Sequence, residues 1–262
     1  MYLTRFRINT ARTGSRRLLS SPQPLHAAVM SAFPTLLPTA SEQPPGVSGP
    51  RVLWRLDQNA RAEVFLYVVS PERPDLTHLV EQAGWPSLAG DPSTPGWETR
   101  PYTPLLERLA KGGAWAFRLT ANPVHYVRNK DGAPTKRTAH TTAVHQKGWL
   151  LKQQERAGFR ILEKPDTSRL LPAGTTYQGH PHHGDRYELT VRDQRDLSFA
   201  KPREERGNKR TAVTLVTATF DGRLEVTDPE LLRHTLTSGL GKAKAYGCGL
   251  LTLAPIAPAP AR

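Results

Sequence analysis

The order of its expected strands and helices most constrains how this chain can fold. Strands are indicated where apolar and polar residues alternate, and the first helix by apolar residues at Leu25, Val29 and Phe33, one face of a helix. In chain order, the first half contains a strand at 2–9, a helix at 25–33, strands at 51–56 and 63–69, a helix at 74–83 and a strand at 114–120. This order, β-α-β-β-α-β, is that of a ferredoxin-like fold.

The second half repeats this order more loosely. It contains a helix at 138–158, strands at 159–162, 186–191, 211–220 and 223–226, a helix at 229–238 and a strand at 249–253. A hairpin turn is expected at Asp221-Gly222, and Asp228 followed by Pro229 is typical of a helix start. We therefore predict an α+β protein with two tandem ferredoxin-like (RRM-like) domains, 1–112 and 113–262, the second less regular.

The charge of the chain indicates its class of partner. Lys and Arg number 36 against 23 acids, for a net charge of +13, and such a surplus attracts polyanions. Nucleic acid is the first expectation, an anionic membrane surface the second, and a generally basic proteome the alternative. With no apolar run near 18 residues, no transmembrane helix is expected.

Single residues and the N-terminal stretch narrow the setting. The one cysteine, Cys248, excludes an intramolecular disulfide and a cysteine-based zinc ribbon. Residues 1–41 carry five arginines and no acid, as an organelle transit peptide would, but residues 2–8 alternate like a strand. We expect a cytoplasmic protein.

A glycine-rich segment lies at 239–249, with two lysines between its glycines. Glycines allow a backbone to approach a bulky ligand, and exposed N–H groups with nearby ammonium charges suit phosphates. The spacing matches neither the Walker A loop nor Gly-x-Gly-x-x-Gly. We expect an RNA-contacting loop, with a plain turn between a helix and a buried strand as the alternative. The candidate contacts are Gly239, Gly241, Lys242, Lys244 and Gly247.

Two further segments are basic. The first contributes Arg128, Lys130, Lys136 and Arg137. The second, 192–210, is expected at a hairpin tip between two strands and contributes Arg192, Arg195, Lys201 and Arg203. Both could contact phosphates of structured RNA, although the acids interleaved in the second leave a merely solvated loop as the alternative.

Four stretches, in order along the chain, resemble the CRISPR-associated CasE endoribonucleases. They are the start Met1-Tyr2-Leu3-Thr4, the segment Leu119-Thr120-Ala121-Asn122-Pro123, the segment 220–226 and the tail 239–255. The resemblance implies two ferredoxin-like domains and metal-independent cleavage, without a cofactor, of a CRISPR repeat stem-loop at the 3′ base of its stem. The 2′-OH would attack, leaving a 2′,3′-cyclic phosphate, and the mature crRNA would be retained with the other subunits of a type I-E Cascade complex.

The family's histidine corresponds to His26. A histidine can take the 2′-OH proton or protonate the leaving oxygen, and in the first turn of a helix the dipole would favour its neutral form. A plain surface histidine is the alternative. Some family members carry a Tyr three residues earlier and a Lys five residues later, where this chain has Gln23 and Ser31. The second catalytic role therefore stays open to Lys242, Lys244 or an arginine.

A histidine cluster lies at 180–185, His-Pro-His-His-Gly-Asp. Neutral imidazoles at this density bind Zn or Ni, but the spacing matches neither His-x-His-x-Asp-His nor His-Glu-x-x-His. A solvated loop is expected, with RNA contact or a metal site as alternatives. Two other functions remain open: an RNA-binding subunit that has lost cleavage, and a metal-dependent hydrolase centred on His180–His183.

Overall fold

The chain divides into two compact units. The computed structural model describes residues 1–33, 51–60, 63–85, 96–128, 135–169, 176–177, 180–181, 185–200 and 212–256. The first unit comprises Met1–Arg108, Leu236–Gly239 and Ala243–Leu250, and the second Leu109–Thr235, Leu240–Lys242 and Leu251–Arg262. Short stretches from the end of the chain therefore group with the first unit, and the predicted division between residues 112 and 113 stays a prediction.

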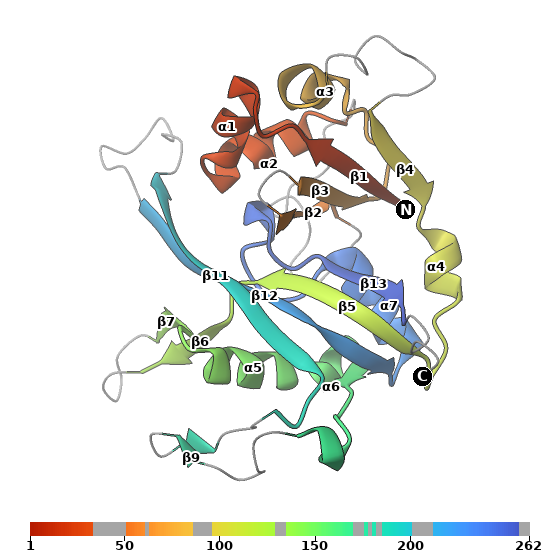
Figure 1. Ribbon diagram of the computed structural model, residues 1–262, viewed down its shortest axis with the longest axis vertical. Coiled ribbons are helices and arrows are strands. Elements are labelled where there is room, and N and C mark those ends of the chain that lie inside the picture. The colour runs from red at the N-terminus through yellow and green to blue at the C-terminus, as the bar shows by residue number, and fades with distance from the viewer. Residues whose placement is uncertain are drawn as a thin grey trace. The chain divides into compact units, whose positions relative to one another are not determined.

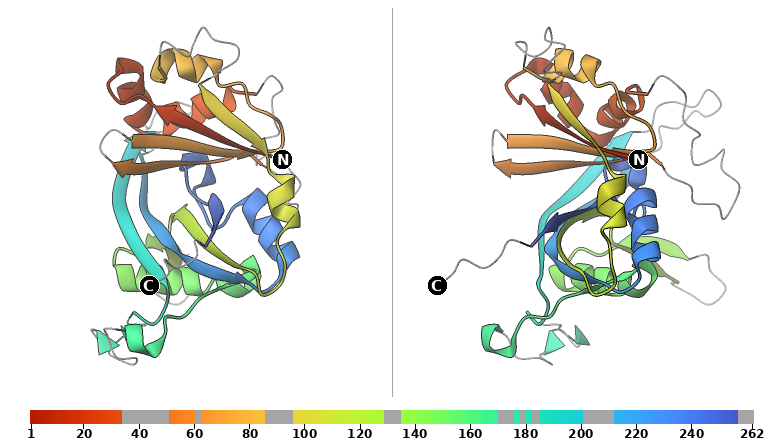
Figure 2. Two further views of the ribbon diagram at one scale, coloured as in Figure 1. Left: turned by 45° about the vertical axis from the view of Figure 1, so that its right-hand side comes forward. Right: turned by 90° about the vertical axis from the view of Figure 1, so that its right-hand side faces the viewer.

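The first unit has the ferredoxin-like strand order. Its antiparallel sheet is ordered β2-β3-β1-β4. The strands are β1 (Tyr2–Ile8), β2 (Leu53–Ala60), β3 (Glu63–Ser70) and β4 (Trp97–Pro101). Helices α1 (Thr13–Leu19), α2 (Pro22–Met30) and α3 (Thr77–Ala83) lie on one face of this sheet (Figures 1 and 2). A short helix, α4 (Thr103–Glu107), follows β4.

Alternation along β1 builds the core of this unit. Phe6 and Ile8 are buried and Arg5 and Arg7 are exposed, so one face of the strand meets the helices. From α2, Leu25 packs into the same cluster. The helix that carries His26 is thus fixed to the sheet by its apolar side.

Two elements of the first unit differ from the prediction. No strand was predicted between the helix at 74–83 and the strand at 114–120, but Trp97–Pro101 forms the edge strand β4. The predicted closing strand at 114–120 belongs to the second unit. Edge strands tolerate proline and need no apolar alternation, so the sequence pattern did not indicate β4. The predicted helix 25–33 begins at Pro22 and ends at Met30, and α1 was not expected.

The second unit is a less regular version of the same order, as predicted. Its sheet runs β11-β12-β5-β13, with β8 also paired to β12. The strands are β5 (Ala114–Ala121), β8 (Phe159–Ile161), β11 (Leu189–Ala200), β12 (Ala212–Val226) and β13 (Leu251–Pro255). Strand β11 pairs the first part of β12 and β8 pairs its end, so together they occupy the place of one ferredoxin-like strand.

Helices α5 (Ala143–Leu151), α6 (Gln154–Ala157) and α7 (Pro229–Ser238) complete this unit. The predicted cap of α7 is confirmed: Asp228 Oδ1 accepts hydrogen bonds from the amides of Glu230 at 2.9 Å and Leu231 at 3.0 Å. The minor elements are β6 (Val124–Val127), β7 (Lys136–Ala139), β9 (Thr176–Tyr177), β10 (His180–Pro181) and the 3₁₀ turns η2 (Asp166–Ser168) and η3 (Lys244–Tyr246).

Two predictions in the second unit are wrong. There is no hairpin at Asp221-Gly222, because β12 runs through both residues. Gly222 is needed for close approach instead, since a Cβ there would lie 2.2 Å from the carbonyl oxygen of Glu188. The predicted helix 138–158 starts only at Ala143, because Thr138 pairs with His125 in the β6–β7 ribbon. Within the described ranges, no helix is long and apolar enough to cross a membrane.

Candidate nucleic-acid interface and catalytic histidine

His26 lies in the second turn of α2, one position beyond the buried Leu25. The predicted place in the first turn is wrong, because the helix begins earlier, at Pro22. The expected direction of the pKa still holds, for a different reason: burial lowers the pKa of His26. Its Nδ1 is buried and has no hydrogen-bond partner among the described residues. The imidazole is therefore favoured in its neutral form, and no described group fixes its tautomer.

The two neighbours that differ from the family pattern have modest roles. Ser31 closes α2 as its C-cap, and its Oγ donates a hydrogen bond to the carbonyl of Ala27 at 2.9 Å. Gln23 lies half-buried in the first turn. Neither residue brings a positive charge to the helix, so a cation near His26 must come from another element.

The glycine-rich segment supplies one such element. Its turn η3 contacts both α2 and β2 within the first unit. Lys244 and Tyr246 lie on this turn. The Nζ of Lys244 donates a hydrogen bond to the carbonyl of Ser238 at 2.7 Å. An ammonium and a phenol are thus held on the turn that packs against the helix of His26.

The glycines of this segment are required by packing. A Cβ on Gly239 would lie 2.8 Å from the Leu53 side chain, and one on Gly247 would lie 2.6 Å from the Trp54 ring. Both residues have positive φ, at 77° and 78°, where other residues are strained. Contact of these glycines with RNA stays a prediction, whereas their need to lack a side chain follows from the fold.

The middle of the segment belongs to the second unit. Gly241 has φ +82°, and a Cβ there would lie 3.1 Å from the ring of Trp149. Lys242 is exposed and forms an isolated β-bridge with Asn122. Its ammonium is therefore presented to solvent from a fixed backbone.

The first basic segment forms a two-stranded ribbon. Strand β7 carries Lys136 and Arg137 opposite Val127 and Tyr126 of β6, and Arg128 follows directly. All three cations are exposed, and none has a carboxylate partner among the described residues. Lys130 lies outside them. Tyr126 is 61% exposed, which is a large exposed fraction for an aromatic side chain. Exposed cations beside an exposed ring suit phosphates and bases.

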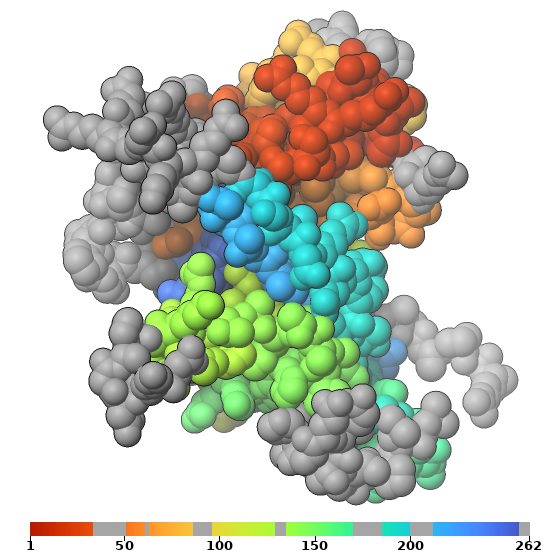
Figure 3. All heavy atoms as spheres, turned by 90° about the vertical axis from the view of Figure 1, so that its left-hand side faces the viewer, coloured from red at the N-terminus to blue at the C-terminus, as the bar shows by residue number. Residues whose placement is uncertain are grey.

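This ribbon lies beside the second basic segment. In Figure 3 the green surface that contains β6, β7 and α5 adjoins the cyan surface of β11, in agreement with the contact between α5 and β11. Within this unit, exposed cations and a long strand thus share one face.

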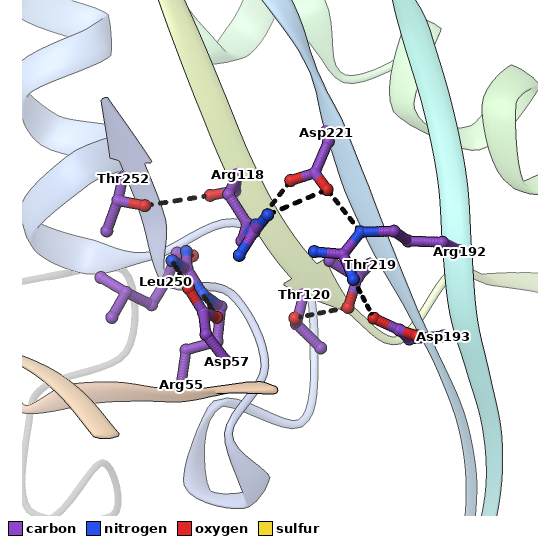
Figure 4. A network of polar contacts seen from close by, with 10 residues as sticks. All are labelled: Arg55, Asp57, Arg118, Thr120, Arg192, Asp193, Thr219, Asp221, Leu250 and Thr252. Atoms are coloured by element: carbon purple, nitrogen blue, oxygen red, sulfur yellow. Dashed lines mark hydrogen bonds and ion pairs between the residues drawn. The ribbon is translucent and has the colours of Figure 1, made fainter. Parts of the chain in front are cut away.

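The second basic segment differs from its predicted place. Arg192 and Arg195 lie within β11 rather than at a hairpin tip, while Lys201 and Arg203 lie outside the described residues. The Nε of Arg192 donates to Asp221 at 2.5 Å, and the Nε of Arg118 donates to the same carboxylate at 2.6 Å (Figure 4). Arg192 is therefore already neutralised, whereas Arg195 is exposed.

Asp221 holds this network together. Burial alone would raise the pKa of Asp221, but the hydrogen bonds and charges of Arg118 and Arg192 outweigh it and lower the pKa. The carboxylate stays ionised between β5 and β11 and joins three strands. Its role is structural, and it explains why an aspartate stands in the middle of β12.

A second histidine cluster was missed by sequence reasoning. The rings of His125 and His140 stack with centroids 4.3 Å apart, and His145 continues the stack at 5.7 Å. These residues share no sequence motif, since a strand, a connection and a helix supply one each. Of the predicted cluster, His180 is in β10, while His182 and His183 lie outside the described residues. In the part of the chain that is described, no group of three or more His, Cys, Asp or Glu side chains is arranged to hold a metal ion.

Two exposed arginines were also missed. Arg16 and Arg17 lie in the last turn of α1, which packs on α2. The signal was present, as an Arg-Arg pair in an acid-free stretch, but without a predicted helix it had no place. These side chains add positive charge close to the helix of His26.

The chain is similar to known proteins over nearly its whole length. A family model described as CRISPR associated protein matches residues 1–255. The CRISPR-associated endoribonuclease Cse3 of Thermus thermophilus is 30% identical over 256 residues, which cover 97% of this chain and all of that protein. The structure of Thermus thermophilus Cse3 bound to an RNA representing a pre-cleavage complex matches with a TM-score of 0.68 and 26% identity, covering 97% of this chain and 98% of that one.

One further likeness concerns the fold alone. A chain of a CRISPR RNA-guided surveillance complex in a pre-nicking state matches with a TM-score of 0.58 and 21% identity. The match covers 98% of this chain and all of that chain.

Proposed function

This chain belongs to the CRISPR associated protein family, and we propose that it is an endoribonuclease that cleaves the repeat stem-loop of precursor crRNA. The observation that carries the proposal is its likeness to Cse3 over the whole length of both chains. Two tandem ferredoxin-like units that carry exposed cations fit an RNA substrate.

We propose that His26 acts as the general base. Because burial lowers its pKa, the imidazole is neutral near pH 7 and can accept the 2′-OH proton. The 2′-oxygen then attacks the adjacent phosphorus and the bond to the 5′-oxygen breaks. The products are a 2′,3′-cyclic phosphate and a 5′-OH, which takes up a proton. No step in this sequence needs a metal ion.

The developing negative charge needs a cation near the phosphate. Lys244 is our candidate for this role, because η3 packs against α2. Tyr246 of the same turn offers a hydroxyl that could position the scissile group. The chemical groups that Gln23 and Ser31 do not supply would thus come from the other end of the chain.

The β6–β7 ribbon is proposed to hold the RNA stem. Arg128, Lys136 and Arg137 are exposed and can neutralise phosphates, with Lys130 as a further candidate. After cleavage the protein would keep its crRNA as a subunit of a type I-E Cascade complex, which is what the resemblance to the CasE endoribonucleases implies. We propose a cytoplasmic location for this work.

A second candidate is an RNA-binding subunit that has lost cleavage. The observation in its favour is that Gln23 and Ser31 place no phenol and no cation at these two positions of the described helix α2 and its cap. This function predicts tight binding of the repeat hairpin without a cut.

The deciding experiment is a single-turnover cleavage assay of the repeat hairpin in EDTA. We expect the wild type to cleave, with a rate that rises through the pKa of His26 and is level above about pH 6.5. His26→Ala should lose roughly 10²–10⁴-fold in rate while RNA binding persists. His234→Ala, which removes an exposed histidine of α7, is the matched control and should cleave normally.

The other outcomes separate the candidates. Tight binding without cleavage by the wild type would favour the binding subunit. Cleavage that EDTA abolishes would contradict the metal-free mechanism and return attention to the histidines at 180–183.

A further inference from the structure

Three consecutive residues of β2 receive the glycine-rich segment. The first contact is between Leu53 and Gly239, and the second between Trp54 and Gly247. At both points the segment approaches so closely that a Cβ would lie under 3 Å from the β2 side chain, at 2.8 Å and 2.6 Å. The segment is therefore seated on β2 at its start and near its end.

Arg55 makes the third contact. Its side chain is 2% exposed, and its NH1 donates a hydrogen bond of 2.9 Å to the carbonyl of Leu250 (Figure 4). Its Nε and NH2 donate to the two carboxylate oxygens of Asp57, at 2.6 Å and 3.0 Å. The guanidinium carbon also lies 5.6 Å from the centroid of the Tyr67 ring. The bidentate pair fixes the plane of the guanidinium, and with it the direction of the bond to Leu250.

Stability alone does not explain a buried ion pair at this position. Removing two charges from water costs about as much as their attraction returns, and apolar pairs of similar volume often serve stability as well or better. An apolar pair could not donate a hydrogen bond to the Leu250 carbonyl. What Arg55 adds over an apolar residue is this bond to the Leu250 carbonyl, 195 residues later in the chain.

The seated segment matters because of what it carries. Between the Gly239 and Gly247 contacts lies η3, with Lys244 and Tyr246, and η3 contacts α2. A shift at the Leu250 end would be transmitted through Gly247, the residue that follows η3, to the groups beside the helix of His26. Misplacement of a catalytic group by about 1 Å can cost as much as about 100-fold in rate.

We propose that Arg55 is a positioning residue for RNA cleavage: held by Asp57, it fixes the glycine-rich segment on β2 and thereby sets η3 against the helix of His26. This inference rests on the proposed function for its kinetic consequence. The seating of the segment itself does not depend on that function.

The test replaces the ion pair with apolar side chains, in the double variant Arg55→Met/Asp57→Leu. We expect the variant to fold, with a melting temperature somewhat below that of the wild type because the buried Leu250 carbonyl loses its donor, and a Kd for the repeat hairpin within about threefold. The single-turnover rate at a saturating excess of protein over RNA should fall by about 10- to 100-fold. Arg55→Lys, which keeps a charge beside Asp57, should recover part of the rate.

The matched control is Arg5→Met/Glu98→Leu. It removes another Arg–carboxylate pair of the same sheet, 2.8 Å apart between β1 and β4, and should cleave at the wild-type rate. A folded Arg55→Met/Asp57→Leu variant that cleaves like the wild type would overturn the inference. If that variant does not fold, Arg55→Lys decides by the same criterion, and a wild-type rate would overturn it.

A second readout is independent of cleavage. Amide hydrogen exchange of Gly247–Leu250 should accelerate in Arg55→Met/Asp57→Leu and stay unchanged in the control. Unchanged exchange would contradict the seating. If the wild type itself does not cleave, the proposed function fails, while this readout still decides whether Arg55 fixes the segment.

Discussion

At the scale of single residues, packing explains the glycines of the C-terminal segment before any ligand is considered. Gly239 and Gly247 combine a left-handed backbone with a neighbour that leaves no room for a Cβ. For His26 as well, the sequence pattern that identified the residue is not the cause of its property. Its place in the chain followed from the resemblance, but its lowered pKa follows from burial, which only the structure reveals.

Gly247→Ala should destabilise the protein more than Gly112→Ala. Both glycines have positive φ, 78° and 82°, so both alanines incur strain of about 1 kcal/mol. Only the Cβ at 247 would press on a ring, that of Trp54, which adds about 1–3 kcal/mol for overpacking. Urea unfolding of both variants measures the difference. Equal losses in the free energy of unfolding would show that the Trp54 ring moves aside without cost.

At the scale of elements, helices and strands with strong periodicity were predicted well, and short ones were predicted poorly. Strands β1 and β3 alternate clearly, and α7 carries its own start signal in Asp228. The edge strand β4 is short and ends in proline, and α1 buries little besides Leu18, so neither leaves a periodic pattern.

The candidate site was only partly predictable for a related reason. His26 was singled out by the family resemblance, and the basic residues of the ribbon could be read locally. Contacts between distant segments could not: nothing in residues 118, 192 and 221 taken separately shows that Asp221 neutralises both arginines. The same holds for η3 against α2.

The histidine stack joins the β6–β7 ribbon to α5 and should make stability depend on pH. Burial, followed by the charges of His125, His145 and Lys152, lowers the pKa of His140 to about 4. The unfolded chain binds a proton at this residue below about pH 6.5, whereas the folded form stays neutral. The contribution of neutral His140 to the free energy of unfolding is therefore complete above about pH 6.5 and is lost as the pH falls towards 4.

His140→Asn should remove that contribution. The melting temperature of the wild type should fall further than that of the variant when the pH is lowered from about 7 to about 4.5. Differential scanning fluorimetry across this range measures it. Parallel curves for the two proteins would mean that the pKa of His140 is the same in the unfolded and folded states.

At the scale of the whole molecule, the net charge of +13 overstates what is available to a ligand. Several arginines are already paired with carboxylates, among them Arg118, Arg160 and Arg192. Among the described residues, the β6–β7 ribbon and α1 each carry neighbouring exposed cations that have no carboxylate partner. Binding strength should therefore follow a few positions rather than the total.

Arg137→Gln should lower the slope of log Kd for the repeat hairpin against log salt by about one, because one phosphate contact is lost. Arg160→Gln is the control, since that exposed guanidinium is paired with Glu225 at 2.7 Å. Its slope should change much less. Filter binding at several salt concentrations gives both values, and equal slopes for the two variants would show that the ribbon does not contact phosphate.

The packing of residues 236–239 and 243–250 within the first unit has a consequence for biosynthesis. The ribosome releases residues 1–108 long before Leu250. The hydrogen bond from Arg55 to the Leu250 carbonyl, 195 residues later in the chain, can form only after that. Closing so long a loop is slow and costs entropy, so this contact forms late. During translation the nascent first unit exposes Leu53 and Trp54 without their cover, and any truncation before residue 236 would leave it permanently in that state.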